Sequence, residues 1–116
     1  MKILIADDNE KNCQLFEICL SAYGTVVIVN DGIDAVNAFR RACETGEWFD
    51  LVYLDCYLPK MDGLEALKAI RRIEFEHGIA DDDRVQITMM STIQDEALIT
   101  RAHQNGCDSF VSQPGH

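Results

Sequence analysis

Residues 49–63, FDLVYLDCYLPKMDG, carry the strongest indication of the fold of this chain. It begins with an apolar run, interrupted by a single acid, whose length and composition are typical of a strand buried on both faces of a sheet. The run ends at Asp55, Pro59 then prevents the ladder from continuing, and Asp62 and Gly63 precede a helical pattern. A strand that ends in an acid and leads into a helix is the usual way in which an open α/β sheet builds a site. Asp55 is therefore the first candidate functional residue.

A second acidic feature lies near the start of the chain. Residues 2–6 (KILIA) are typical of a short buried strand, and Asp7 and Asp8 follow at once. If the two strands are adjacent and parallel, three carboxylates converge at one edge of the sheet, and they stay ionised only when a positive charge neutralises them. Mg²⁺ suits such a site because it prefers a few carboxylates, retained waters and phosphate oxygens. The alternative interpretation is a turn with a helix N-cap at Asp7 and Asp8, and an exposed loop acid at Asp55.

Apolar periodicity and turn residues predict the other elements. Strands are expected at residues 2–6, 25–29, 49–54, 85–90 and 109–112, and helices between Asn9 and Gly24, between Asp31 and Gly46, beyond Gly63, and from a capping box of Thr92 and Asp95 to Asn105 and Gly106. Five alternations of strand and helix with short links imply a doubly wound, parallel α/β sheet.

Helical spacing also predicts which side chains face the core. The inward faces are Leu15, Phe16, Cys19, Leu20 and Tyr23 in the first helix, Ile33, Val36, Phe39 and Cys43 in the second, and Leu64, Leu67, Ile70 and Ile73 in the third. The charged residues of the third helix, Glu65, Lys68, Arg71, Arg72 and Glu74, are predicted to be solvated. The run Asp81–Asp83 predicts an exposed loop, because three consecutive acids cannot all face one metal ion.

The composition of the chain excludes several classes of function. At 116 residues it is expected to form one domain, and its net charge of −10 argues against direct binding of nucleic acid or of an anionic membrane surface. The five cysteines show no metal-binding spacing and indicate reduced, mostly buried thiols in a cytoplasmic protein. No apolar run approaches the ~20 residues that a membrane-spanning helix needs.

Three motifs in this order resemble the receiver domain of two-component response regulators, including the single-domain chemotaxis type. They are IADDN at 5–9, LDCYLPKMDGLE at 54–65 and MMST at 89–92, and the resemblance covers nearly the whole chain. It implies a flavodoxin-like five-stranded sheet of order 2-1-3-4-5, spanning a receiver domain at residues 1–116. In that order the first and third strands are neighbours, so their acids would converge.

The resemblance also implies the chemistry of the site. Asp55 would accept a phosphoryl group, and Mg²⁺ would be held by Asp7, Asp8, Asp55 and the backbone carbonyl of Tyr57. Ser91 would be the switch hydroxyl. The phosphodonor would be a histidine kinase or a phosphotransfer protein. The domain would catalyse only its own phosphorylation and dephosphorylation, and its conformational switch would control a partner or an attached output domain.

Two positions of the predicted switch depart from the family pattern. The family has a lysine before the proline that follows the fifth strand, and this chain has Gln113. A neutral amide brings no charge, so we expect coupling between phosphorylation and the switch to be weakened. Phe110 stands where the family has its switch aromatic, and it lacks a hydroxyl.

The family pattern also includes a fifth helix, and only two residues follow Pro114 here. We therefore expect the chain to be a fragment of a longer protein, or truncated before that helix. Without the helix, one face of the sheet would rest on the first helix alone, and a partner protein or a second copy of the chain in a homodimer would cover it.

Two other functions compete with a phosphorylated receiver. Gln113 is compatible with a pseudo-receiver, a protein-interaction module that responds weakly or not at all to phosphate. A phosphohydrolase is disfavoured because Tyr57, two residues beyond Asp55, cannot replace an acid that protonates a leaving group. The bulky Tyr57 and Ile93 are predicted to slow hydrolysis of a phosphorylated state, and Lys60 is predicted to be a solvated loop lysine.

Overall fold

The computed structural model of the protein describes residues 1–92 and 95–112. Its five parallel strands are β1 (Lys2–Ala6), β2 (Thr25–Val29), β3 (Leu51–Asp55), β4 (Gln86–Ser91) and β5 (Ser109–Ser112), in the spatial order β2-β1-β3-β4-β5. The helices are α1 (Glu10–Leu20), α2 (Gly32–Thr45), α3 (Gly63–Glu76) and α4 (Glu96–Gln104). The predicted flavodoxin-like sheet and its order are confirmed, with strands three and four displaced by one or two residues.

The links between strands and helices carry side-chain caps. The predicted caps Asn9 and Asp31 accept backbone N–H bonds at the starts of α1 and α2, and Asp62 does the same at α3. The prediction that Thr92 begins the last helix is wrong. Asp95 is itself the N-cap of α4, because its carboxylate accepts from the backbone N–H groups of residues 97 and 98. Within the described residues no helix follows β5.

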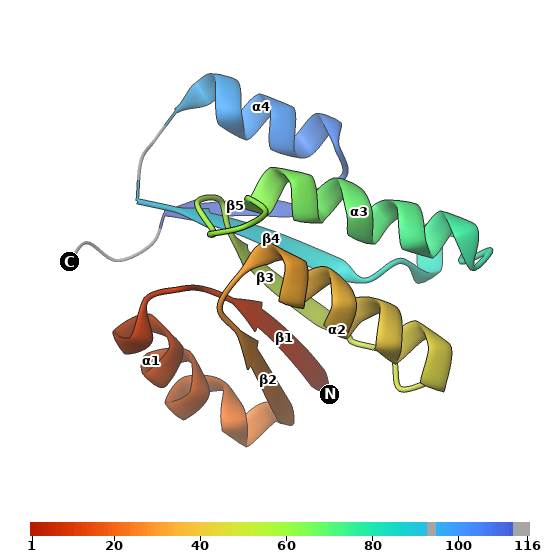
Figure 1. Ribbon diagram of the computed structural model, residues 1–116, viewed down its shortest axis with the longest axis horizontal. Coiled ribbons are helices and arrows are strands. Elements are labelled where there is room, and N and C mark those ends of the chain that lie inside the picture. The colour runs from red at the N-terminus through yellow and green to blue at the C-terminus, as the bar shows by residue number, and fades with distance from the viewer. Residues whose placement is uncertain (93–94, 113–116) are drawn as a thin grey trace.

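Helices cover both faces of the sheet. Right-handed crossovers place α1 on one face and α2, α3 and α4 on the other (Figure 1). Leu4 and Ala6 of β1 belong to the core under α2–α4, whereas Ile3 and Ile5 point to the α1 face, and all four are fully buried. Burial on both faces explains why the sequence of β1 is a continuous apolar run.

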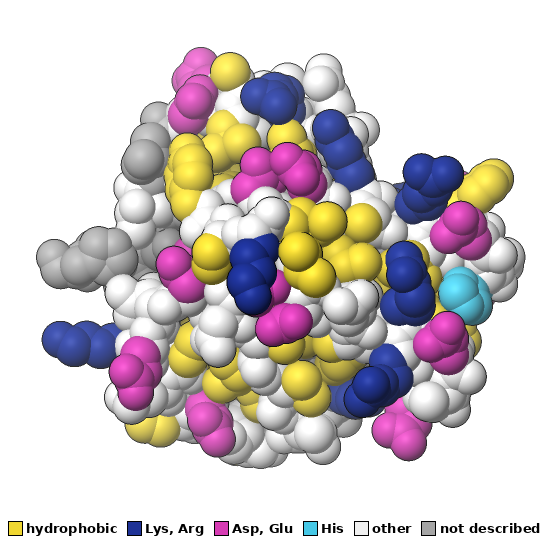
Figure 2. Space-filling model, in the orientation of Figure 1, with side chains coloured by type: hydrophobic (Ala, Val, Ile, Leu, Met, Phe, Trp, Pro, Cys, Tyr) yellow, Lys and Arg dark blue, Asp and Glu magenta, His cyan; other side chains and the backbone are white. Residues whose placement is uncertain are grey.

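Fewer residues of α1 pack against the sheet than the sequence predicts. Phe16 stacks on Tyr53 of β3 with ring centroids 5.8 Å apart, and Cys13 is buried beside them. The predicted inward positions Leu15, Cys19 and Tyr23 are wrong, since all three side chains are exposed, Leu15 by 52% and Tyr23 by 67%. Ile33 of α2 was also predicted to face inward, and it is 41% exposed. The buried face follows the Cys13 and Phe16 spacing instead, and in the described residues α1 is the only helix on this side. Acidic, basic and apolar side chains are interspersed on the opposite face (Figure 2).

The charged face of α3 is not fully solvated, which corrects another prediction. Arg71 and Glu74 have side chains only 9% and 1% exposed, and they form an ion pair at 2.7 Å. Arg71 also donates to the backbone carbonyls of Val85 and Gly106 and to the carboxylate of Asp108. These two charged residues follow Ile70 and Ile73 at the border of the apolar face, where the α4–β5 link covers them. The network therefore ties α3 to the starts of β4 and β5.

Candidate functional site

The register of the sheet brings the predicted acids together. Ala6 of β1 pairs with Leu54 of β3, so the residues that come next, Asp7 and Asp55, lie at the same level on neighbouring strands. Both strands point the same way, and their carboxyl ends therefore meet at one edge. The convergence expected from the sequence is present.

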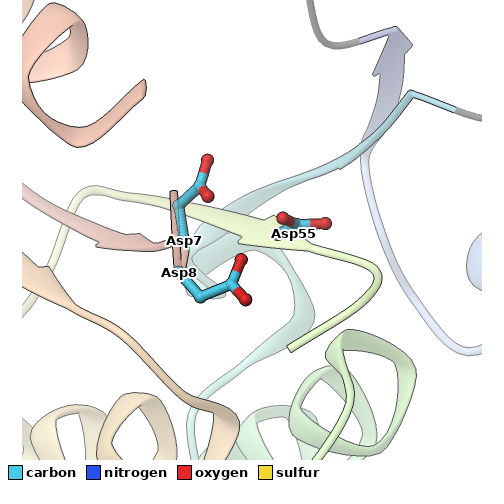
Figure 3. Close-up of side chains that lie close together, drawn as sticks. All are labelled: Asp7, Asp8 and Asp55. Carbon is cyan, nitrogen blue, oxygen red and sulfur yellow. The ribbon is translucent and has the colours of Figure 1, made fainter. Parts of the chain in front are cut away.

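Three carboxylates form the cluster. One oxygen from each of Asp7, Asp8 and Asp55 lies within 4.8 Å of the others, at the ends of β1 and β3 (Figure 3). Asp7 and Asp55 are buried and Asp8 is exposed. The alternative of a separate turn and an exposed loop acid does not describe Asp55, whose exposure is 7%. Hard oxygen ligands at this spacing fit Mg²⁺, and the exposed side at Asp8 leaves room for retained waters.

Asparagines hold Asp7 in place. Its carboxylate accepts from the backbone N–H of Asn9 at 2.9 Å and from the side-chain amide of Asn12 at 3.3 Å. Its backbone carbonyl accepts from the side chain of Asn30 at 3.1 Å, and its backbone N–H donates to Val29. Sequence reasoning missed Asn12 and Asn30. The signal for Asn12 was its place in the first turn of a helix that begins directly after the acid.

The loop after β3 is packed tightly around Asp55. The backbone N–H of Tyr57 donates to the Asp55 carboxylate at 3.0 Å, and the N–H of Gly63 donates to the carbonyl of Cys56. A Cβ at Gly63 would lie 2.1 Å from the backbone oxygen of Asp55, and one at Gly32 would lie 1.9 Å from a carbonyl of the same loop. Glycine is therefore required at both positions for the loop to approach the helices.

The other predicted site residues lie around this edge. Ser91 ends β4 with 1% exposure, one residue beyond Met90, which pairs with Asp55 in the sheet. Phe110 is half-buried against the core on β5, and the side chain of Tyr57 is 53% exposed. Gln113 and Ile93 were also predicted to act here, and both lie outside the described residues.

Lys60 does not join the acidic cluster. It is 66% exposed, as predicted for a solvated lysine, and its ammonium lies 3.5 Å from the carboxylate of Asp31. The backbone N–H of Asp34 and, to a lesser degree, the charge of Lys60 hold the pKa of Asp31 below its usual value. This contact joins the loop after β3 to the start of α2.

A buried thiol adjoins the cluster. Burial, and then the neighbouring Asp55 charge, raise the pKa of Cys56 to about 12. The thiol is therefore neutral at physiological pH and is not a nucleophile.

The comparisons with known proteins agree with this geometry. The model of the response regulator receiver domain matches residues 3–116. The chain belongs to the response regulator receiver domain family. Receiver domains are parts of two-component phosphorelay systems, and the recognition made from the three sequence motifs is confirmed.

The most similar relatives include sensor kinases. The chain is 33% identical over 114 residues to the sensor protein GacS of Pseudomonas syringae pv. syringae, covering 97% of this chain and 12% of that protein. It is 27% identical over 116 residues to the osmosensing histidine protein kinase SLN1 of Saccharomyces cerevisiae, covering 98% of this chain and 9% of that protein. The receiver thus corresponds to a small part of these proteins. None of its described helices is long and apolar enough to cross a membrane.

Solved receiver structures have the same architecture. The receiver domain of the histidine kinase CKI1 from Arabidopsis thaliana, complexed with Mg²⁺ and BeF₃⁻, matches with a TM-score of 0.83 at 26% identity, covering 96% of this chain and 79% of that one. The receiver of sensor histidine kinase PA1611 from Pseudomonas aeruginosa, with magnesium in its active-site cleft, matches with a TM-score of 0.76 at 27% identity, covering 99% and 86%.

Proposed function

We propose that this receiver accepts a phosphoryl group on Asp55 in a Mg²⁺-dependent reaction and changes conformation as a result. The observation that carries the proposal is the cluster of Asp7, Asp8 and Asp55, with Asp55 the last residue of a buried central strand. Three carboxylates this close repel one another, and a divalent cation removes that repulsion.

The phosphodonor proposed is a phosphohistidine on a histidine kinase or phosphotransfer protein. Relatives named as histidine kinases support that class of partner. A carboxylate oxygen of Asp55 attacks phosphorus, the P–N bond breaks as the P–O bond forms, and the imidazole leaves. The product is an acyl phosphate, which water later hydrolyses to return the carboxylate and inorganic phosphate. The chain catalyses only these two steps on itself.

The residues around Asp55 position the reaction. Asp7 and Asp8 hold the metal, and Asn9 and Asn12 fix the carboxylate of Asp7. When bound, Mg²⁺ neutralises charge on the transferring phosphoryl group. The Tyr57 backbone N–H holds one oxygen of Asp55, and the Tyr57 carbonyl is the fourth proposed metal ligand.

Ser91 is the proposed switch hydroxyl. It ends the strand beside Asp55 and precedes the link to α4, so a hydroxyl that turns toward a phosphoryl oxygen would draw that link inward. Phe110 is the aromatic that would follow the movement on β5. An output domain or partner protein would read the altered α4–β5 surface.

The cysteines support a cytoplasmic location. All five are free thiols, and four of them are buried. Disulfides are rare in reducing compartments, so we place the receiver in the cytoplasm.

Beryllofluoride tests the proposal, because this phosphoryl mimic needs both an ionised Asp55 and bound Mg²⁺. Amide ¹H–¹⁵N spectra would be recorded with Mg²⁺ and then with the mimic, for the wild type, for Asp55→Asn and for the remote control Asp82→Asn. We expect shifts around Asp55, Ser91 and α4 in the wild type and control, and none from the mimic in Asp55→Asn.

The pattern of shifts separates the competing functions. Shifts confined to the loop after β3 would show an interaction module that has lost its switch, as Gln113 would allow. No response to the mimic in the wild type would refute the phosphoacceptor function.

A further inference from the structure

A cavity of about 370 Å³ opens at the end of the sheet opposite the aspartate cluster. Its residues come directly before β3 and β4 and from the C-terminal parts of α2 and α3, far from the strand ends that carry Asp55 (Figure 1). The volume lies within the ~300–1,000 Å³ typical of small-ligand sites. The phosphoacceptor chemistry does not use this cavity.

The cavity is aromatic. Phe39 and Phe49 are buried and stacked with centroids 6.5 Å apart, and Val85 is buried next to them in the lining. Trp48 also lines the cavity but is 47% exposed. Phe49 already contacts one cation, since the ammonium of Lys2 lies 4.6 Å from its ring centroid. Because Phe39 and Phe49 are buried and stacked on each other, the half-exposed ring of Trp48 is the π-face available to a planar or cationic group.

The charge of the lining is negative. Among the residues that the structure describes, Glu74 and Asp83 are the only charged ones that line the cavity, and no lysine or arginine lines it. Both oxygens of Glu74 are held, one by Arg71 and the other by the backbone N–H of Val85, each at 2.7 Å. Asp83 is exposed, and among residues 1–92 and 95–112 no basic side chain forms an ion pair with it. The carboxylate available to a ligand is therefore that of Asp83.

We propose that this cavity binds a guanidinium group, carried either by a free small molecule or by an arginine side chain of a partner protein. A guanidinium is planar, stacks on aromatic faces and pairs with a carboxylate. It can therefore stack on the ring of Trp48 and form an ion pair with the carboxylate of Asp83. An anion would be repelled by both acids in a chain of net charge −10. A neutral apolar group would provide no positive charge to pair with the carboxylate of Asp83.

Trp48 is the only tryptophan of the chain, so its fluorescence and its indole NMR signal report on the cavity directly. The probe is N-acetylarginine amide, and N-acetylcitrulline amide is its neutral counterpart of nearly the same shape. We expect a saturable change with the arginine compound and about fivefold weaker binding of the citrulline compound. Equal affinity for the two, or no saturable change with either, would overturn the proposal.

Two matched variants separate the site from the overall negative charge. Asp82 and Asp83 share the same short turn, but only Asp83 lines the cavity. Asp83→Asn should weaken binding of N-acetylarginine amide about threefold, and Asp82→Asn should leave it unchanged. An equal loss in both variants would mean nonspecific attraction and would contradict the proposal.

The same assay distinguishes the source of the guanidinium. Tighter binding of an arginine-centred pentapeptide than of the amide would identify a protein partner, whereas equal binding would identify a free ligand, and both results support the site. Asp55→Asn should bind the probe like the wild type, so failure of this proposal is separable from failure of the phosphoacceptor function.

Discussion

Neutralising Asp8 should stabilise the metal-free protein. The carboxylate of Asp8 lies within 4.8 Å of those of Asp7 and Asp55 and is the exposed member of the three. At that separation two unit charges repel by about 0.9 kcal/mol in water and by about 3.5 kcal/mol at an effective dielectric constant of 20. Because Asp8 is exposed, the lower value applies, and two neighbours give about 1–2 kcal/mol. Asp8→Asn should therefore raise Tm by about 4–8 °C in EDTA.

With Mg²⁺ added, the wild type should become more stable than Asp8→Asn. At a Mg²⁺ concentration one hundred times Kd, binding stabilises the folded wild type by about 2.7 kcal/mol, which exceeds the advantage of about 1–2 kcal/mol that Asp8→Asn has in EDTA. Asp8→Asn lacks one proposed metal ligand, so the same Mg²⁺ concentration should stabilise it by only a small fraction of that value. Thermal unfolding monitored by circular dichroism, with and without Mg²⁺, measures both effects.

The control for this experiment is Asp82→Asn, which makes the same change of charge in an exposed turn at the opposite end of the sheet. It should change Tm little and should retain the full Mg²⁺ shift. The reasoning would be refuted if Asp8→Asn were no more stable than the wild type in EDTA, or if it kept the wild-type response to Mg²⁺.

Three further predictions concern stability. Arg71→Ala should lower the free energy of unfolding in urea by about 3–5 kcal/mol, because it leaves Glu74 buried without its partner. The control is Arg72→Ala, which removes a side chain that is 80% exposed and should cost less than about 0.5 kcal/mol. Similar losses in the two variants would contradict the buried ion pair. Because the pKa of Cys56 is raised, the thiol's contribution to the free energy of unfolding is fully present below the unfolded thiol pKa of about 8.5 and is lost as pH rises toward about 12. Cys56→Ala should therefore reduce the fall in stability at alkaline pH. An unchanged fall would exclude the thiol as its cause. Gly63→Ala should lower the free energy of unfolding by about 1–3 kcal/mol and also abolish the beryllofluoride response, because the new Cβ would collide with a β3 carbonyl. A variant with normal stability and a normal response would show that the loop can move aside.

The prediction that a first helix between Asn9 and Gly24 buries Leu15 and Tyr23 failed for a physical reason. A short helix with apolar residues on more than one side has several candidate inward faces, and the sheet beneath it decides between them. Here the ring of Tyr53 on β3 selects Phe16, 37 positions earlier in the chain. The pattern of apolar residues within the helix cannot predict a contact with so distant a residue.

The alternation of strands and helices, the acids at two strand ends and the family could all be predicted from the sequence. These follow from local patterns, since burial on both faces demands continuous apolar strands and a parallel sheet places its strand ends at one edge. Three features became visible in the folded chain alone: Asn12 holds Asp7, Arg71 and Glu74 are buried, and Trp48 and Asp83 line one cavity. Each of these depends on where separate segments meet in space. The charge or polarity of a side chain does not reveal whether another part of the chain will cover it.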